Sequence, residues 1–233
     1  MNRRLVLAGG CSLLFLPVLA GCDRVSSLTY RFRTTIEVET PNGVVKGSAV
    51  RELSYTKSYL PFGQGELYPR DVRGEAVVVN IPGGPIFALI DYGQLRTRSG
   101  DGELLAWVDG HPDADYGDIG NPRIPELNKM KVLVDRQFKW VLPRDQWPRF
   151  VHFRDIDDPT TVEPVDPNHI RLAVGEVFKI RRIMIQITDE PVTWGIKKII
   201  PSFGPETNFD DWYKSLPLGS PRRISKENFI VGV

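Results

Sequence analysis

The sequence predicts a mainly β protein, a single antiparallel β domain with a few short helices. Three observations lead to this fold class. Turn signals recur at short spacing, and several segments between them alternate polar and apolar residues. Almost no segment has the longer period of an amphipathic helix. A sandwich and a partly open barrel fit equally well, because both are built from short antiparallel strands.

The first predicted element is an antiparallel hairpin. Residues 29–40 alternate strictly, which indicates a strand with one buried face. An Asn42-Gly43 pair then predicts a hairpin turn. Residues 44–55 are expected to return as the second strand. The apolar face of the first strand carries Tyr30, Phe32, Thr34, Ile36 and Val38.

A second hairpin is expected after a long irregular segment at residues 55–71. Residues 75–81 contain three consecutive valines, so this segment is apolar on both faces and is expected to be a central strand. Residues 82–85 read Pro-Gly-Gly-Pro, which turns the chain. Residues 86–90 are expected to return as the partner strand.

The later elements are less uniform. Residues 127–142 fit either a strand or a helix followed by a strand. Within residues 178–188 the apolar phase slips by one position at Arg181-Arg182, and such a slip predicts a β-bulge. Asp166-Pro167 has the pattern of an N-cap and a first helical position, which predicts a helix over residues 167–174. Two shorter elements are expected, a strand at residues 150–153 and a helix at residues 209–215.

Residues 29–233 are expected to form this one domain. Roughly 200 residues are enough to bury one hydrophobic core. The hydrophobic content of 41% is typical of a globular chain. No change in composition divides the segment into two parts.

The N-terminal residues have the features of an export signal. Arg3 and Arg4 precede an apolar run from Leu5 to Ala20. A basic start, an apolar segment and small residues near its end are typical of a secretory signal peptide. A membrane-spanning helix needs about 20 uninterrupted apolar residues. This run is shorter and contains two adjacent glycines and a proline, which weaken a helix.

The run ends in Leu19-Ala20-Gly21-Cys22, which resembles the lipobox of bacterial lipoproteins. The resemblance implies that the Cys22 sulfur receives a diacylglyceryl group and that cleavage removes residues 1–21 as a signal peptide. Acylated Cys22 then becomes the first residue, and residues 22–28 form a lipidated tether. The alternative is an ordinary signal peptide with a cysteine at this position by chance.

The same resemblance implies a location in the cell envelope, facing the periplasm. The lipid bilayer is the expected partner of Cys22, because two or three acyl chains hold a protein stably where one does not. Asp23 resembles the signal that keeps lipoproteins of enteric bacteria on the inner membrane. The inner membrane is therefore favoured over the outer.

Charge and cysteine content exclude several function classes. The chain has 30 basic and 29 acidic residues, and loss of Arg3 and Arg4 with the signal leaves 28 and 29. A near-neutral domain lacks the basic surface that nucleic acid requires. Cys11 leaves with the signal and Cys22 is acylated. No thiol then remains for a disulfide, for thiol catalysis or for a metal site.

Residues 151–201 resemble a pattern found in uncharacterised proteobacterial proteins, which look similar over most of the mature chain. The recurring parts are the Asp-Pro pairs, the segment Ile187 to Thr193, and Gly195-Ile196. The opening segment Thr35 to Gly43 is also shared. This resemblance implies no activity, and no site residue is carried over from it.

An acidic loop contains the candidate metal ligands Asp109, Asp113 and Asp115. Calcium takes several oxygen ligands on a flexible turn, which suits alternating acidic residues. An EF-hand that starts at Asp109 needs Gly at its sixth position and Glu at its twelfth, and this chain has Ala114 and Gly120 there. A solvated acidic loop is therefore the preferred interpretation, and no cofactor is expected.

Other catalytic patterns are absent or incomplete. A second acidic cluster, Asp155, Asp157, Asp158 and Glu163, is explained by Asx-Pro turn chemistry. The three histidines, His111, His152 and His169, have no zinc-ligand spacing. Gly-x-Ser-x-Gly is missing, and the glycines between residues 43 and 47 are assigned to the hairpin rather than to a phosphate loop.

The remaining candidate is aromatic. Tyr59, Phe62 and Tyr68 lie in the long irregular segment, where tyrosines suit a carbohydrate or protein partner. Their alternative role is to cover a sheet edge. The favoured function is a non-enzymatic, membrane-anchored binding or accessory module for an envelope protein or polysaccharide. An envelope hydrolase that uses the acidic loop residues is the alternative.

Overall fold

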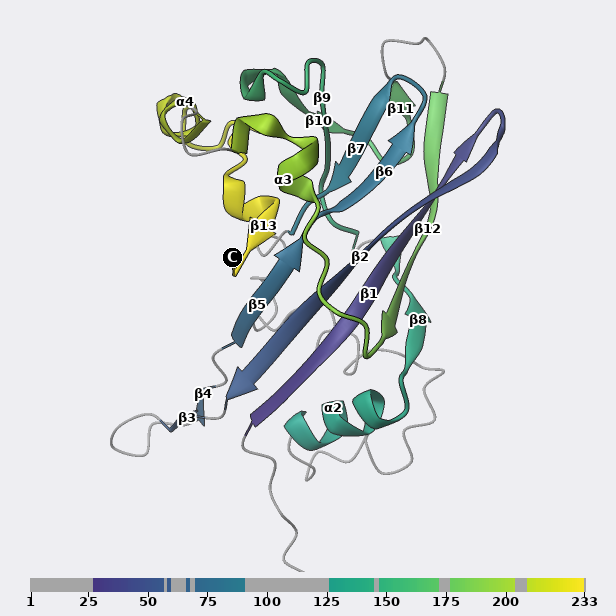
Figure 1. Cartoon of the computed structure of the whole chain (residues 1–233), viewed down its shortest axis with the longest axis vertical. Coiled ribbons are helices and arrows are strands. Elements are labelled where there is room, and N and C mark those ends of the chain that lie inside the picture. Colours follow the sequence, from purple (N-terminus) through teal and green to yellow (C-terminus); the bar gives the residue numbers. More distant parts are fainter. Residues whose placement is uncertain are drawn as a thin grey trace, which may run out of the picture.

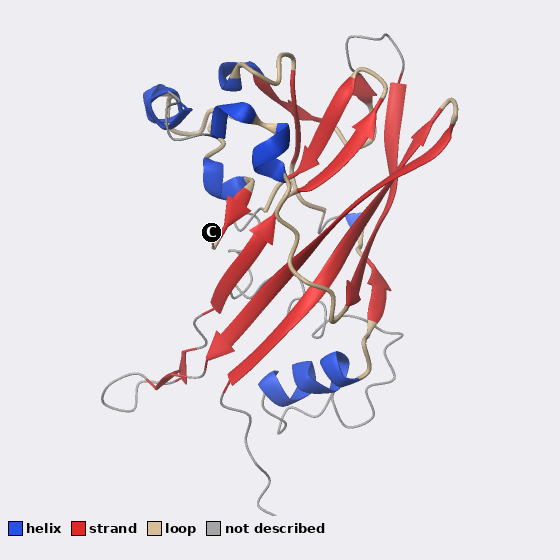
Figure 2. Ribbon diagram, in the orientation of Figure 1, coloured by secondary structure: helices blue, strands red, loops and turns tan. Residues whose placement is uncertain are grey.

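Two antiparallel β-sheets pack against each other in the computed structural model, and short helices cover the outer side of the second sheet (Figures 1 and 2). The structure describes residues 27–56, 58–59, 66–67, 70–90, 126–144, 147–171, 177–203 and 209–232. The predicted fold class is confirmed, since the described part of the chain is mainly β with a few short helices. Of the two architectures expected, the sandwich fits, because the described strands form two separate antiparallel sheets with a shared core between them and close no barrel.

Sheet 1 contains seven of the described strands in the order β11-β12-β1-β2-β5-β13, with β8 also paired to β12. The outer edge of β12 is thus shared by two short strands, β11 near its start and β8 near its end. The strands are β1 (Ser27–Thr40), β2 (Gly43–Thr56), β5 (Arg70–Glu75), β8 (Lys139–Val141), β11 (Ile170–Arg171), β12 (Val177–Ile187) and β13 (Ile230–Val231).

The predicted first hairpin is confirmed. β1 and β2 pair along their whole length, from Ser27 opposite Thr56 to Thr40 opposite Gly43. The two turn residues are Pro41 and Asn42 rather than the expected Asn-Gly pair. Proline fixes φ near −65°, so Pro41 suits the first turn position, and Gly43 follows with a φ of 113° that favours glycine.

The predicted bulge in β12 is also confirmed. Glu37 pairs with Arg182 and Val38 pairs with Ile180, so Arg181 is the extra residue. The bulge corrects the apolar phase, because Ile180 and Ile183 are both buried although they differ in parity. It also places Arg182 directly opposite Glu37.

Sheet 2 has four described strands in the order β10-β9-β7-β6. They are β6 (Val77–Ile81), β7 (Gly84–Ala88), β9 (Phe150–Phe153) and β10 (Val162–Val165). The predicted second hairpin and the strand at residues 150–153 are confirmed. The expectation of a central strand at residues 75–81 is wrong, because β6 lies at the edge of this sheet. Its residues are apolar on both sides because both faces of the sheet are covered.

The first core lies between the two sheets and includes Phe32 and Ile36 of β1 and Val79 of β6. Gly47 of β2 allows β6 to approach closely here. A Cβ atom at Gly47 would lie 2.0 Å from the backbone oxygen of Val78, and this distance is too short for any residue with a side chain. Gly47 lies on the second strand of the hairpin, as expected, and it has the further role of letting the two sheets meet.

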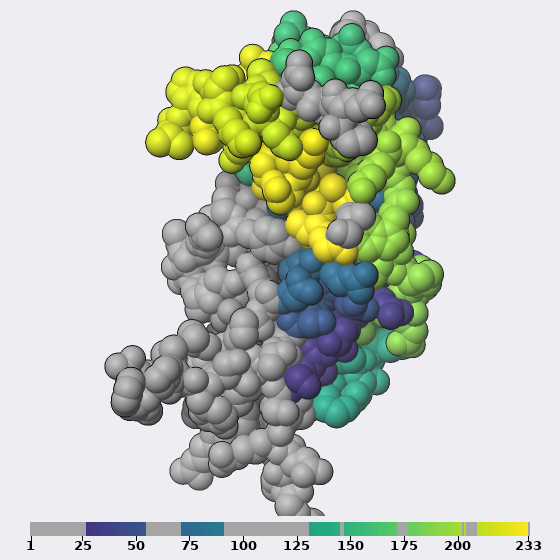
Figure 3. Space-filling model, turned by 60° about the vertical axis from the view of Figure 1, so that its left-hand side comes forward, coloured from purple at the N-terminus to yellow at the C-terminus, as the bar shows by residue number. Residues whose placement is uncertain are grey.

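The second core lies on the other face of sheet 2, beneath the C-terminal segment, whose described residues are 196–203 and 209–232. Phe87 and Phe153 of the sheet and Phe229 of the C-terminal segment are in mutual ring contact at 5.6 to 5.8 Å between centroids. Figure 3 shows the C-terminal segment in yellow over the upper part of the molecule. Its helices are α3 (Ile196–Ile199), η6 (Pro201–Phe203), α4 (Phe209–Ser215, as predicted) and η7 (Lys226–Asn228).

Glu75 joins sheet 1 to this helical layer. Its side chain is buried, and its Oε2 accepts hydrogen bonds from the backbone N–H groups of Gly195 at 2.5 Å and Ile196 at 2.7 Å. These groups begin α3 and have no partner within that helix. A carboxylate from a distant strand therefore caps this helix.

The structure decides one open prediction and corrects two others. Residues 127–142 form helix α2 (Glu126–Asp135) followed by β8, as the second alternative expected. The helix predicted at residues 167–174 is wrong, because residues 167–169 form a turn and β11 begins at Ile170. The segment expected to be irregular contains the paired strands β3 (Ser58–Tyr59) and β4 (Glu66–Leu67).

Candidate functional site

Most of the sites predicted from the sequence lie outside the described residues. These are Cys22, Asp23, Phe62, Tyr68, Asp109, Asp113 and Asp115. Tyr59 lies on β3, where its backbone pairs with Glu66 of β4. The lipidation, aromatic-binding and metal-site predictions therefore remain predictions.

The second acidic cluster forms a turn, as its Asx-Pro pattern predicted. Asp158 accepts hydrogen bonds from the Thr160 hydroxyl at 2.7 Å and from the Thr160 backbone N–H at 2.9 Å. These bonds hold the pKa of Asp158 below its ordinary value of 3.8. Asp155 accepts from the N–H of Asp157 at 3.0 Å. Both carboxylates are thus engaged in shaping their own loop, which caps helix η5 (Pro159–Thr161).

The two described histidines lie apart from each other. His152 Nε2 lies 3.7 Å from Glu163, which also pairs with Arg154 at 2.8 Å between Nε and Oε1. His169 Nε2 accepts a hydrogen bond from Arg171 at 2.9 Å. Among the described residues, no group of three or more His, Cys, Asp or Glu side chains is placed to hold a metal ion.

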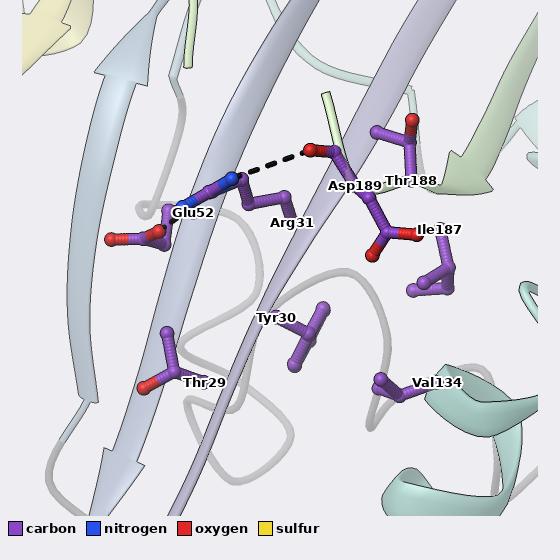
Figure 4. A pocket seen from close by; sticks show the side chains of 8 residues that line it. All are labelled: Thr29, Tyr30, Arg31, Glu52, Val134, Ile187, Thr188 and Asp189. Atoms are coloured by element: carbon purple, nitrogen blue, oxygen red, sulfur yellow. Dashed lines mark hydrogen bonds and ion pairs between the residues drawn. The ribbon is translucent and has the colours of Figure 1, made fainter. Parts of the chain in front are cut away.

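A first hollow, which we call the β1 pocket, lies beside the start of the first strand and has a volume of about 240 Å³ (Figure 4). It forms where β1 extends beyond β12, since their pairing begins at Phe32 and Ile187. Its lining combines polar groups with the apolar side chains of Tyr30, Val134 and Ile187.

The charges of the β1 pocket are balanced by their neighbours. Arg31 lies between Glu52 and Asp189, with 2.8 Å from its Nε to Glu52 Oε2 and 3.4 Å from Nη1 to the Asp189 backbone oxygen (Figure 4). The carboxylate of Asp189 accepts from Gln137 at 2.8 Å, and Arg73 lies 3.7 Å from Glu52. A charged ligand would have to displace these contacts, so this pocket is poorly suited to bind one.

A second hollow, which we call the arginine pocket, has a volume of about 260 Å³ and lies where the segment after β8 meets β9 and β10. Two cations and an aromatic ring contribute to it, Arg144, Arg149 and Trp147. Four prolines also line it, Pro148, Pro164, Pro167 and Pro221. Pro164 is tolerated in β10 because this strand lies at the edge of sheet 2.

The guanidinium of Arg144 is held in place from two sides. It lies over the Trp147 ring, 5.3 Å from the ring centroid, and its Nη1 donates to the Asn168 side-chain oxygen at 2.6 Å. Trp147 is fixed in turn, because its Nε1–H donates to the backbone oxygen of Leu142 at 3.0 Å. Asn168 is fixed by the Asp166 turn, where its N–H donates to Asp166 Oδ1 at 2.9 Å.

The arginine pocket differs from the β1 pocket in its charge. None of the described residues that line it carries a carboxylate. Within the described part of the chain, the only hydrogen bond that the Arg144 side chain donates is to the neutral amide oxygen of Asn168. A cation so placed can bind an anionic group, while the tryptophan and prolines offer an apolar wall beside it.

The sequence contains a local signal for part of this pocket. Pro143-Arg144 and Trp147-Pro148-Arg149 place two arginines around a tryptophan within a short proline-bounded connection. The contribution of residues 164–167 and 221 depends on the pairing of β9 with β10 and on the position of the C-terminal segment. That part is not readable from local pattern.

None of the described helices is long and apolar enough to cross a membrane. No protein-family model matches the chain, and neither a curated protein nor a solved structure matches it significantly.

Proposed function

We propose that this chain is a lipid-anchored envelope protein whose β domain faces the periplasm and acts as a non-enzymatic binding or accessory module. The observation that carries the binding role is the arginine pocket, in which Arg144 pairs with no carboxylate of the described residues and is fixed beside an apolar wall. A fixed recognition group binds with a smaller loss of conformational entropy than a mobile one. The anchor is supported by the lipobox-like Leu19-Ala20-Gly21-Cys22.

The length of the segment between Cys22 and β1 supports this arrangement. Ser27 is the first residue of β1 and follows Cys22 by five positions. Five extended residues span at most about 17 Å. Acylation at Cys22 thus keeps the start of β1 close to the bilayer surface. Strands β9 and β10, which line the arginine pocket, lie at the other end of the molecule in Figure 1.

The bilayer is one partner in this proposal, and an envelope protein or polysaccharide is the other. Two or three acyl chains at Cys22 anchor the domain stably without a spanning helix. Asp23 favours the inner membrane, where the pocket is presented to the periplasmic space. Nucleic acid is not a partner, because the mature chain has a net charge near zero, with 28 basic and 29 acidic residues.

An envelope hydrolase that uses acidic loop residues is the less supported alternative. A glycosidase needs two carboxylates that face each other across a cleft. Asp155 and Asp158 are used instead to form the turn before β10. The alternative therefore rests on Asp157 and on Asp109 and Asp113, of which the last two lie outside the described residues.

Two matched measurements in native cells test the proposal. Fractionation should find the wild-type protein in the membrane and a Cys22→Ala variant no longer lipid-anchored. A photoreactive residue in place of exposed Pro221 should cross-link to an envelope component, while the same residue in place of exposed Trp194 should not. Cys22→Ala retained in the membrane like the wild type, or equal cross-linking at both positions, would contradict it.

A further inference from the structure

We infer that the arginine pocket binds an acidic, proline-containing peptide segment of a periplasmic protein, with Arg144 receiving a carboxylate of that segment. This inference rests on the proposed function and gives the chemistry of its partner. Three features of the pocket lead to it, namely its charge, the fixed orientation of its arginine, and its size and lining.

The charge of the pocket selects an anion. Arg144 lines it, and none of the described lining residues is acidic. Arg149 also lines it and has an interaction of its own. Arg144 shares one N–H with Asn168, while the rest of its planar fork matches the two oxygens of a carboxylate. Hydrogen bonds between charged partners are roughly twice as strong as neutral ones. An acidic side chain is thus a better occupant than a neutral one.

The orientation of Arg144 is set before a ligand arrives. Arginine loses much rotamer entropy when a ligand immobilises it, and a stacked arginine has already lost it. Here Trp147 supports the guanidinium plane, and Trp147 is itself locked by its hydrogen bond to Leu142. Such double support is typical of a recognition group, and it orders this side chain although the residue is exposed.

The size of the pocket favours part of a chain over a whole small molecule. Its volume of about 260 Å³ lies below the roughly 300–1,000 Å³ of pockets that enclose small ligands. A peptide that places one or two residues in the hollow fits this size.

The lining favours proline beside the acidic residue. Extended proline-rich segments dock on grooves lined by aromatic rings, and they lose little entropy because they are already extended. A neutral sugar offers no anion to the Arg144 guanidinium, whereas an acidic side chain does. A peptide is therefore favoured over a polysaccharide.

The test is a calorimetric titration of the full-length protein in detergent micelles. The probe is a capped six-residue peptide with one central glutamate between prolines, and the matched probe carries glutamine instead. We expect the glutamate peptide to bind and the glutamine peptide to bind about ten- to a hundredfold more weakly. Equal affinity for the two peptides, or no binding of either, would overturn the inference.

Variants of the protein locate the effect. Arg144→Gln should lower the affinity for the glutamate peptide by the same factor. The affinity of Arg144→Lys should lie between those of the wild type and Arg144→Gln, because lysine keeps the charge and loses the planar fork of donors. Exposed Arg181→Gln, on the bulge, is the matched control and should bind like the wild type. Thermal unfolding of each variant shows whether it is folded. An unchanged affinity in folded Arg144→Gln, or displacement of the peptide by an equal concentration of inorganic phosphate, would overturn the inference.

This outcome can be separated from that of the proposed function. If peptide binding fails while Pro221 still gives cross-links in cells, the module has a partner of another chemistry and only the inference is lost. If the peptide binds but the Cys22→Ala variant stays in the membrane like the wild type, the anchoring proposal is lost and the pocket chemistry stands.

Discussion

Glu37 of β1, which lies opposite the bulge of β12, offers the sharpest test of the fold. Its carboxylate is almost fully covered, with 1% of the side chain exposed, and it pairs with Arg182 at 2.7 Å and Lys46 at 2.9 Å. The hydrogen bonds from Arg182, and then that from Lys46, hold the pKa of Glu37 at about 2 instead of 4.5. At 1.36 kcal/mol per pKa unit, this difference corresponds to roughly 3 kcal/mol.

Solvent screening reduces this value. The side chains of Arg182 and Lys46 are 43% and 58% exposed, so their charges are partly screened by water. We therefore expect Glu37→Gln to lower the free energy of unfolding at pH 7 by about 1–2 kcal/mol. Urea unfolding followed by far-UV circular dichroism measures this directly.

The pH dependence has a definite sign. The folded-state pKa is lowered, so the stabilisation by Glu37 is complete above its unfolded pKa near 4.5 and is lost as the pH falls toward about 2. The difference between wild type and Glu37→Gln should accordingly be constant from pH 7 to about 5. It should shrink steadily below that range.

Glu39→Gln is the matched control. Glu39 also pairs with a β12 cation, Lys179 at 2.9 Å, but both side chains are widely exposed, at 40% and 59%. This substitution should change stability by less than about 0.5 kcal/mol at any pH. Equal losses of unfolding free energy in the two variants would refute this explanation. A loss in Glu37→Gln that is the same at pH 3 as at pH 7 would also refute it.

Four further outcomes are expected. Gly47→Ala should destabilise the fold by about 3 kcal/mol or more in urea, because its Cβ would lie 2.0 Å from a β6 backbone oxygen, whereas exposed Ser48→Ala should be near neutral. Phe229→Ala should cost about 3–5 kcal/mol by the same assay, since it empties the centre of the second core. Glu75→Ala should cost about 1–3 kcal/mol and speed amide exchange in α3, which loses its cap. Calcium titrated into the protein should release no heat and leave the melting temperature unchanged, if residues 109–118 form a solvated acidic loop as the sequence favours; a stabilising shift would contradict this.

The strand pattern was the most predictable part of the structure. Strict alternation in residues 29–40 fixes which side chains of β1 face the core, because successive residues of a strand point to opposite faces. The slip at Arg181-Arg182 was equally readable, since a strand with one buried face cannot change its phase without an extra residue. Both signals are local and depend on burial alone.

The errors arise where tertiary structure decides. Asp166-Pro167 carries a helix-start signal, but Ile170 is needed in sheet 1 and pairs with Phe178, so the Asp caps a turn instead. The valines of β6 predict burial on two faces. The second face is covered by the C-terminal segment, which lies more than a hundred residues further along the chain. The arginine pocket combines three distant segments in the same manner. Its arginines and tryptophan were visible in the sequence, while the hollow between them was not.

The anchor is the claim on which location and partners depend, and the mass of the N-terminal peptide tests it most directly. Protein purified from native membranes, digested and examined by mass spectrometry should begin at Cys22 and carry a diacylglyceryl group on its sulfur. A peptide that begins at Met1, or one with an unmodified Cys22 sulfur, would contradict the account.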